Sequence, residues 1–311
     1  MAENIVSEAG PGPREPVVRR SELTCPAHSL KMMAKAAASE ADEVILDLED
    51  SCPLSQKVEA RKTLIEALST FDFRGKLRAF RPNHVRTKFF YRDLIDVVEA
   101  AGQHLDAVIV AKVQGPEDVL FVDRLLTQIE QNVGLQPGRI RIEVVIESAR
   151  ALLKADAIAT ATPRLSALIF GIADYAADTG AKELTREQFQ VYHYPKAHTI
   201  AAARAAGIDV IDNVTLQFRD LDQCKLDAQR AAQLGFDGKW AIHPDQVRVI
   251  NDVFTPSREE LGRAREIVDA YRQTGIDPGL NAVVYQDEMI DPAVLRTEWK
   301  KVAIAKKAGL L

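Results

Sequence analysis

The chain of 311 residues has few cysteines, few aromatic residues and no excess of basic charge. Its three cysteines, Cys25, Cys52 and Cys224, fit neither a disulfide framework nor a zinc site, which favours small buried side chains in a reducing compartment. A nucleophilic cysteine paired with His28 or His243 has no supporting motif. The net charge of −5, from 40 basic and 45 acidic residues, argues against a general nucleic-acid-binding protein.

The sequence also lacks a long hydrophobic run and an export signal. No apolar stretch approaches the roughly 20 residues that span a bilayer. Residues 1–18 are polar and rich in glycine and proline, which predicts a disordered tail. We therefore expect a cytoplasmic protein that binds neither nucleic acid nor membrane. With 47% apolar residues, the rest of the chain has enough apolar side chains for one large barrel or two smaller domains.

Short apolar runs alternate with longer segments of helical periodicity. The predicted strands are Ser21–Cys25, Glu43–Leu48, Leu77–Phe80, Ala107–Ala111, Arg141–Ile146, Leu165–Phe170, Ile208–Ile211 and Lys239–Ile242. The predicted helices include Lys57–Leu68, Phe90–Ala100, Pro116–Asn132, Glu187–Ala206 and Leu221–Leu234. Several strands are almost continuously apolar, as in a parallel sheet covered on both faces. Eight strand–helix units over about 230 residues indicate a (β/α)8 TIM barrel.

A doubly wound open sheet is the alternative fold. It would normally have a glycine-rich turn after its first strand, but the sequence there is Cys25-Pro26-Ala27-His28. We therefore predict an α/β protein with a TIM-barrel catalytic domain over residues 19–256. A C-terminal helical extension over 257–311, with helices at Ser257–Thr274 and Pro292–Lys307, is predicted to be a lid, an oligomer contact or both.

Charged or polar residues follow seven of the eight predicted strands, at the end of a barrel where active sites are built. They are Asp47, Glu49 and Asp50, then Arg81, Lys112, Glu147, Asp174, Asp212 and His243. Strand alternation places Asp47 and Glu49 on the interior face, where carboxylates need hydrogen bonds or a cation. A metal-site role and a simple salt bridge to Arg61 or Lys57 both remain open.

Glu147 and Asp174 follow neighbouring strands, which lie about 4.8 Å apart in a sheet. Two carboxylates without accompanying histidines or cysteines favour Mg²⁺ over zinc. A glycosidase-type acid/base pair is the alternative, although aromatic residues for sugar binding make up only 6% of the chain. Arg81 is suited to binding a carboxylate or neutralising an oxyanion. We interpret His243 as structural.

Several motifs together resemble the family of the citrate lyase β subunit and the malyl-CoA and β-methylmalyl-CoA lyases, within the HpcH/HpaI aldolase-like superfamily. They are Arg20-Ser21-Glu22-Leu23, Leu46 through Asp50, Ile146 through Arg150, Phe170-Gly171 with Asp174, Gly238 through Pro244, Val253 through Ser257, and Met289-Ile290-Asp291. The similarity runs from about Arg19 to Ala308, nearly the whole chain, and the order and spacing of the motifs make it specific.

The resemblance implies a TIM barrel that binds Mg²⁺, or Mn²⁺, through Glu147 and Asp174. It implies that Arg81 contacts a 2-keto acid and that Asp291 supplies an acid/base or water-activating carboxylate at a neighbouring subunit's site. Family members form homotrimers or homohexamers and break or make a carbon–carbon bond in β-hydroxyacyl-CoA thioesters. On this basis we expect the catalytic residues to be Arg81, Asp291, Asp47 and Glu49. We expect Glu147 and Asp174 to bind the metal, and Lys35, Lys31 and Thr24 to contact coenzyme A.

The sequence departs from the family pattern in the loop after the first strand, where Ser29 replaces the usual CoA-binding arginine. It departs also at Pro82, at Ala111 and at Asn213. The metal and keto-acid half of the site is therefore complete, whereas the CoA half is altered. A malyl-CoA or citramalyl-CoA lyase is the leading hypothesis. A thioester hydrolase, a CoA-independent aldolase and a non-catalytic metabolite-binding protein are the alternatives.

Overall fold

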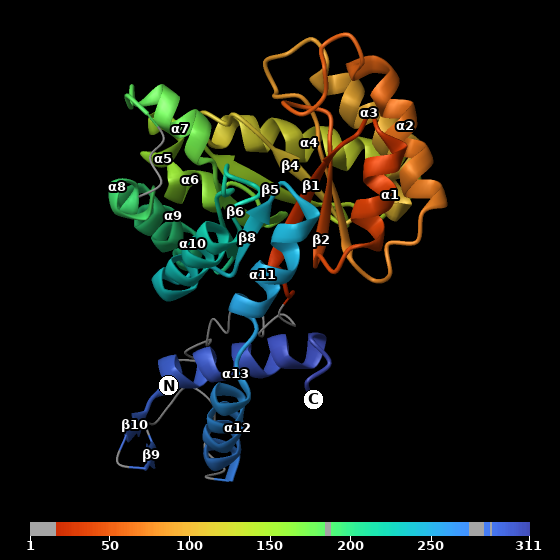
Figure 1. The fold of residues 1–311 in the computed structure, drawn as a ribbon. Coiled ribbons are helices and arrows are strands. Elements are labelled where there is room, and N and C mark those ends of the chain that lie inside the picture. The colour runs from red at the N-terminus through yellow and green to blue at the C-terminus, as the bar shows by residue number, and fades with distance from the viewer. Residues whose placement is uncertain (1–16, 184–187, 274–282, 287) are drawn as a thin grey trace, which may run out of the picture. The chain divides into compact units, whose positions relative to one another are not determined.

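The computed structural model describes residues 17–183, 188–273, 283–286 and 288–311. Of the tail predicted over residues 1–18, residues 1–16 lie outside this part of the chain. The described chain divides into two compact units, one over Arg19–Phe254 and one that contains the described part of Thr255–Leu311. Both units are shown in Figure 1.

The first unit is a closed barrel of eight parallel strands, each paired with the next in the chain and the last paired with the first. The strands are β1 (Ser21–Pro26), β2 (Glu43–Asp47), β3 (Leu77–Arg81), β4 (Ala107–Val110), β5 (Arg141–Ile146), β6 (Leu165–Phe170), β7 (Asp209–Asp212) and β8 (Gly238–Ala241). All eight predicted strands are present within one or two residues, and the predicted TIM barrel is confirmed. Continuous apolar runs are easy to recognise because both faces of such strands are buried.

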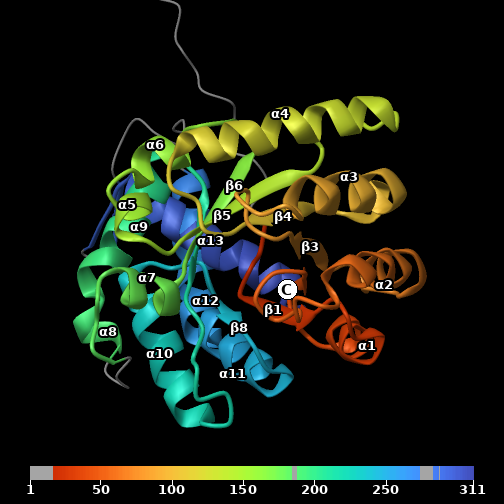
Figure 2. The ribbon, with the colours of Figure 1, turned by 90° about the horizontal axis from the view of Figure 1, so that it is seen from above.

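Helices surround the barrel (Figure 2). They are α1 (Leu30–Ala38), α2 (Lys57–Thr70), α3 (Phe90–Ala101), α4 (Pro116–Asn132), α5 (Ala149–Leu152), α6 (Ala155–Ala159), α7 (Ile172–Asp178), α8 (Gln188–Val191), α9 (His193–Ala205), α10 (Leu221–Leu234) and α11 (Pro244–Phe254), with a 3-10 turn, η1, at Gly102–His104. The predicted helices Pro116–Asn132 and Leu221–Leu234 begin and end at the same residues as α4 and α10. The predicted helix Glu187–Ala206 is instead two helices, α8 and α9. No described helix is long and apolar enough to cross a membrane.

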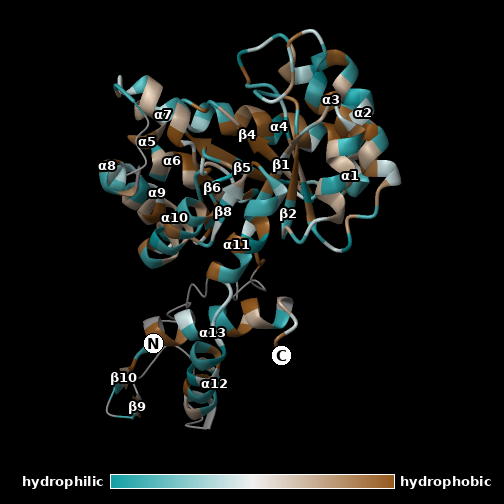
Figure 3. Ribbon diagram, in the orientation of Figure 1, coloured by the Kyte–Doolittle hydropathy of each residue, from teal (hydrophilic) through white to brown (hydrophobic). Residues whose placement is uncertain are grey.

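The core has two concentric parts. Outward-facing strand residues pack with the apolar faces of the helices, and inward-facing residues such as Ile45, Ile109, Val145 and Ile211 form a separate cluster with Trp240 inside the barrel. In the hydropathy colouring of Figure 3 the barrel strands are mostly hydrophobic, whereas the helices around them mix hydrophobic and hydrophilic residues. Alternating side-chain direction along each strand therefore decides which residues face the barrel axis.

The second unit contains two helices and a hairpin. Helices α12 (Arg258–Gln273) and α13 (Pro292–Lys307) pack with the antiparallel strands β9 (Val283–Tyr285) and β10 (Glu288–Ile290) around a small core. Ile267, Tyr271 and Leu295 are buried in that core. Asp291 precedes α13 and its Oδ1 accepts a 2.8 Å hydrogen bond from the backbone N–H of Val294, which caps the helix.

Candidate active site

Asp47 and Arg81 form a bidentate ion pair at the carboxyl ends of β2 and β3. The two residues are register partners, and the guanidinium Nε and Nη2 donate to the two carboxylate oxygens at 2.7 Å each. Burial by itself would raise the pKa of Asp47, but the charge and hydrogen bonds of Arg81, with further donors at Ser51 and Glu49, lower it to about 2. Asp47 is therefore a permanent carboxylate that fixes the orientation of the guanidinium.

Glu49 lies beside this pair and contacts a second cation. Its Oε1 accepts a 2.7 Å hydrogen bond from Nζ of Lys112, and its Oε2 is 3.6 Å from Nη1 of Arg81. The alternative ion-pair partners considered for this segment are wrong. Lys57 donates to two backbone carbonyls, those of residues 48 and 49, and Arg61 pairs with Asp93.

Lys112 connects the acidic residues of three strand ends. Its backbone has φ 55°, a left-handed conformation that is uncommon for a residue with a side chain. Its backbone N–H donates to Oε1 of Glu147, and its Nζ is 3.0 Å from Asp50 and 3.9 Å from Asp174. Burial lowers the pKa of Lys112, but its bonds to Glu49 and Asp50 more than offset this effect and raise it. The sequence indicated a charge at this strand end but did not indicate these partners.

Glu147 follows β5 directly and is buried, whereas Asp174 lies in the first turn of α7 and its side chain is 44% exposed. Gly171 makes the room that Glu147 needs, because a Cβ there would lie 2.6 Å from Cβ and 3.0 Å from Oε2 of Glu147. Burial, and then the charge of Asp174, raise the pKa of Glu147 to about 8 against the opposing effects of Lys112 and Arg81. The two carboxylates repel each other, and a bound cation would relieve that repulsion.

The expected coenzyme A contacts lie on β1 and α1. Thr24 is half-buried on β1, and its hydroxyl accepts a hydrogen bond from the indole N–H of Trp240, whose ring lies 5.2 Å from the guanidinium carbon of Arg81. Lys31 and Lys35 are exposed and one turn apart on α1. Thr24 thus belongs to the packing beneath Arg81, whereas the two lysines are placed to meet a charged group in solvent.

Of two other strand-end residues, Asp212 differs from its expected surroundings and His243 does not. Ile211 faces the barrel interior, so Asp212 faces outward, where it pairs with Lys196 at 2.6 Å and Lys239 at 2.8 Å. Its inclusion among the residues at the barrel mouth was wrong, because an outward strand end contacts the helix layer. The ring of His243 stacks on Phe218 at 5.3 Å, in keeping with the structural interpretation.

The sequence of the barrel unit matches a known family. Residues 20–244 match HpcH/HpaI aldolase/citrate lyase. The chain belongs to this family. The resemblance inferred from the motifs is thereby confirmed, and membership places the chain among the carbon–carbon lyases.

Named relatives extend the match to almost the whole chain. An L-malyl-CoA/β-methylmalyl-CoA lyase from Cereibacter sphaeroides is 38% identical over 301 residues, which cover 92% of this chain and 93% of the relative. The citrate lyase β subunit of Leuconostoc mesenteroides subsp. cremoris is 30% identical and covers 90% of this chain and 91% of its own length.

One similar solved structure contains bound ligands. The protein CitE from Mycobacterium tuberculosis, in complex with magnesium, acetoacetate and coenzyme A, is 27% identical, has a TM-score of 0.72, and covers 93% of this chain and 98% of its own. Magnesium and coenzyme A, which the sequence led us to expect as cofactor and substrate carrier, are therefore found together in a protein of the same fold.

Proposed function

We propose that this protein is a Mg²⁺-dependent lyase acting on a β-hydroxyacyl-CoA of the malyl-, β-methylmalyl- or citramalyl-CoA type. It would cleave the thioester into an acyl-CoA and a 2-keto acid, or join the two. The observation that carries the proposal is the convergence of Glu147, Asp174 and the Asp47–Arg81 pair at one end of the barrel.

Glu147 and Asp174 fit a magnesium ion. They provide hard oxygen ligands, one buried and one accessible, and burial together with their mutual repulsion raises the pKa of Glu147. Mg²⁺ bound there would act as a Lewis acid that polarises the oxygen of the keto group. The neighbouring Lys112 holds Glu147 in place through its backbone N–H and neutralises Glu49 through its ammonium group.

Arg81 is suited to the negative charge that develops during cleavage. Two of its five N–H donors are occupied by Asp47, which leaves donors on Nη1 and Nη2 for a substrate carboxylate or oxyanion. Since the guanidinium is largely buried and already oriented, its charge requires little reorganisation when the substrate reacts.

Cleavage requires a base that removes the proton of the substrate hydroxyl. The C–C bond then breaks, its electron pair passes to the thioester as an enolate, and protonation of the enolate carbon gives the acyl-CoA. We assign the base to Asp291, supplied by the C-terminal extension of a neighbouring subunit in a homotrimer or homohexamer. Lys31 and Lys35 are assigned to the phosphates of coenzyme A, with Thr24 supporting the site through Trp240.

An assay with malyl-, β-methylmalyl- and citramalyl-CoA in the presence of Mg²⁺ tests the proposal. We expect keto acid and acyl-CoA to be released in equal amounts from at least one thioester, and release to be lost in Glu147→Gln. Free thiol without matching keto acid would instead identify a hydrolase. Cleavage of a free hydroxy-keto acid, with no affinity for coenzyme A in calorimetry, would identify a CoA-independent aldolase. Folded protein that releases neither product would contradict all three.

A further inference from the structure

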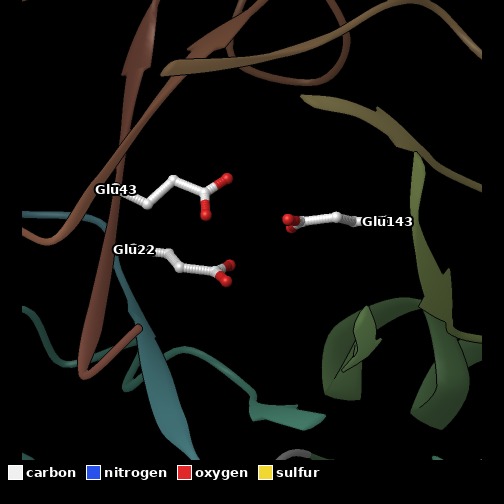
Figure 4. A group of neighbouring side chains, drawn as sticks. All are labelled: Glu22, Glu43 and Glu143. Carbon is white, nitrogen blue, oxygen red and sulfur yellow. The ribbon is translucent and has the colours of Figure 1, made fainter. Parts of the chain in front are cut away.

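A second acidic cluster lies inside the barrel, on β1, β2 and β5. Glu22 and Glu43 are register partners on neighbouring strands, and Glu143 points toward them from across the barrel (Figure 4). One carboxylate oxygen from each residue lies within 4.8 Å of the others, and all three side chains have no exposed surface. We call these three residues the floor cluster.

The floor cluster is separate from the candidate active site. Along β2 the inward-facing residues are Glu43, Ile45 and Asp47, and along β5 Glu143 and Val145 precede Glu147 in the same way. Four residues of strand correspond to about 13 Å. The apolar interior layer that contains Ile45 and Val145 lies between the two sets of carboxylates. The mechanism proposed above therefore makes no use of the floor cluster.

Arg19 is the cation that the described chain places against the floor cluster. Its Nε is 3.1 Å from Oε2 of Glu43, its Nη2 is 2.9 Å from Oε1 of Glu143, and its Nη1 is 2.8 Å from the partly exposed Asp209. Gly238 permits this approach, because a Cβ there would lie 1.7 Å from the carbonyl oxygen of Arg19. One guanidinium cannot balance three ionised glutamates: with all three charged, two negative charges would remain, in addition to that of the partly exposed Asp209.

Three carboxylate oxygens of Glu22 and Glu43 have no hydrogen-bond donor within the described chain. Both oxygens of Glu22 and Oε1 of Glu43 are buried and accept no hydrogen bond there. Burial and the charges of the neighbouring glutamates raise the pKa of Glu22, and they raise that of Glu43 to about 8. Buried acceptors without donors are rare in folded proteins and need an explanation, such as an ion or bound protons.

We propose that Glu22, Glu43 and Glu143 bind a divalent cation that joins β1 and β2 to β5 inside the barrel. The donors are oxygens only, which suits a hard ion such as Ca²⁺, Mg²⁺ or Mn²⁺. A charge of two, added to that of Arg19, balances the three glutamates. Both oxygens of Glu22 are available to the ion, so Glu22 is the principal ligand. The ion has a structural role: it stabilises the barrel and takes no part in catalysis.

Metal analysis of the full-length protein tests this proposal. In the double variant Glu147→Gln/Asp174→Asn, which lacks the proposed active-site ligands, we expect about one divalent ion per chain after refolding with Ca²⁺, Mg²⁺ or Mn²⁺ and gel filtration. Addition of Glu22→Gln should remove that ion and the increase in melting temperature that accompanies it. Asp209→Asn is the matched control, because Asp209 contacts Arg19 without belonging to the cluster, and it should retain the ion.

A folded double variant that binds no ion, and whose melting temperature none of the three cations changes, would overturn the proposal in favour of protonated glutamates. If the double variant does not fold, the ion contents of the wild type and of Glu22→Gln are compared directly. We expect Glu22→Gln to contain one divalent ion per chain fewer than the wild type. Equal ion contents would contradict the proposed site. Catalytic turnover is not measured in either comparison, so the result does not depend on the proposed function. Conversely, a failed lyase assay would leave the ion count unchanged.

Discussion

Asp47 and Arg81 face each other across two adjacent strands, and both carboxylate oxygens accept a 2.7 Å hydrogen bond from the guanidinium. This paired geometry is available to arginine and not to lysine. It fixes the guanidinium at the carboxyl end of the barrel, within 3.6 Å of Glu49 and over the ring of Trp240. The most buried ion pair at the candidate active site therefore orients the group expected to meet the substrate.

Asp47→Asn should remove a pH-dependent part of the stability. The folded-state pKa of about 2 lies below the ordinary value of 3.8, so the carboxylate stabilises the fold above about pH 4 and the contribution is lost as the pH falls toward 2. We expect a linkage contribution of about 2 kcal/mol that disappears over this range. Urea unfolding of wild type and variant at a series of pH values measures it. A difference that grows on acidification would contradict the expectation, and the more exposed pair Arg78–Asp106, disrupted by Asp106→Asn, provides the control.

Arg81→Lys should reduce catalysis without unfolding the protein. The ammonium group retains the charge but loses the two-point contact with Asp47, and we expect kcat/KM to fall by about a hundredfold or more. Steady-state kinetics in both directions measure the loss. Arg78→Lys, on the same strand but paired at the barrel exterior with Asp106, should remain near wild type. Equal effects of the two substitutions would show that Arg81 acts only through stability.

Asp174→Asn should weaken Mg²⁺ binding by at least about tenfold, because it removes one of the two carboxylates proposed to bind the ion. Asp178→Asn is a matched control on the same helix, where the carboxylate accepts a 2.8 Å hydrogen bond from the backbone of Ala149. Calorimetric titration with Mg²⁺ distinguishes the two variants. Unchanged affinity in Asp174→Asn would show that the metal does not use this carboxylate.

Gly171→Ala should lower Mg²⁺ affinity although it changes no charge. The added Cβ would lie 2.6 Å from Cβ of Glu147 and 2.8 Å from Cγ1 of Val145, so the Glu147 side chain must move. We expect about a tenfold loss of metal affinity and destabilisation of about 1–3 kcal/mol from overpacking. Gly262→Ala, where nothing lies within 4 Å of the added carbon, is the control. Wild-type affinity in Gly171→Ala would mean that Glu147 is not held as described.

The sequence alone determined the barrel and the inward direction of Asp47 and Glu49 at its carboxyl end. Apolar runs mark strands buried on both faces, and strand alternation placed Asp47 inside the barrel. Only the tertiary structure decided which charges meet. In the structure Asp47 pairs with Arg81, Lys112 pairs with Glu49, and Asp212 faces outward and pairs with two lysines.

The floor cluster shows most clearly the difference between what the sequence determines and what the tertiary structure determines. Glu22, Glu43 and Glu143 each occur near the start of a separate strand. Alternation puts Glu43 on the same face as Asp47 and Glu143 on the same face as Glu147, but nothing in the sequence shows that the three glutamates meet. Barrel closure places β1 beside β2 and brings β5 across from them, which makes one buried group of the three. Local patterns in a sequence record which face a side chain occupies, because that depends on its own strand. Electrostatic partners depend on strands far apart in the chain, so only the closed barrel determines them.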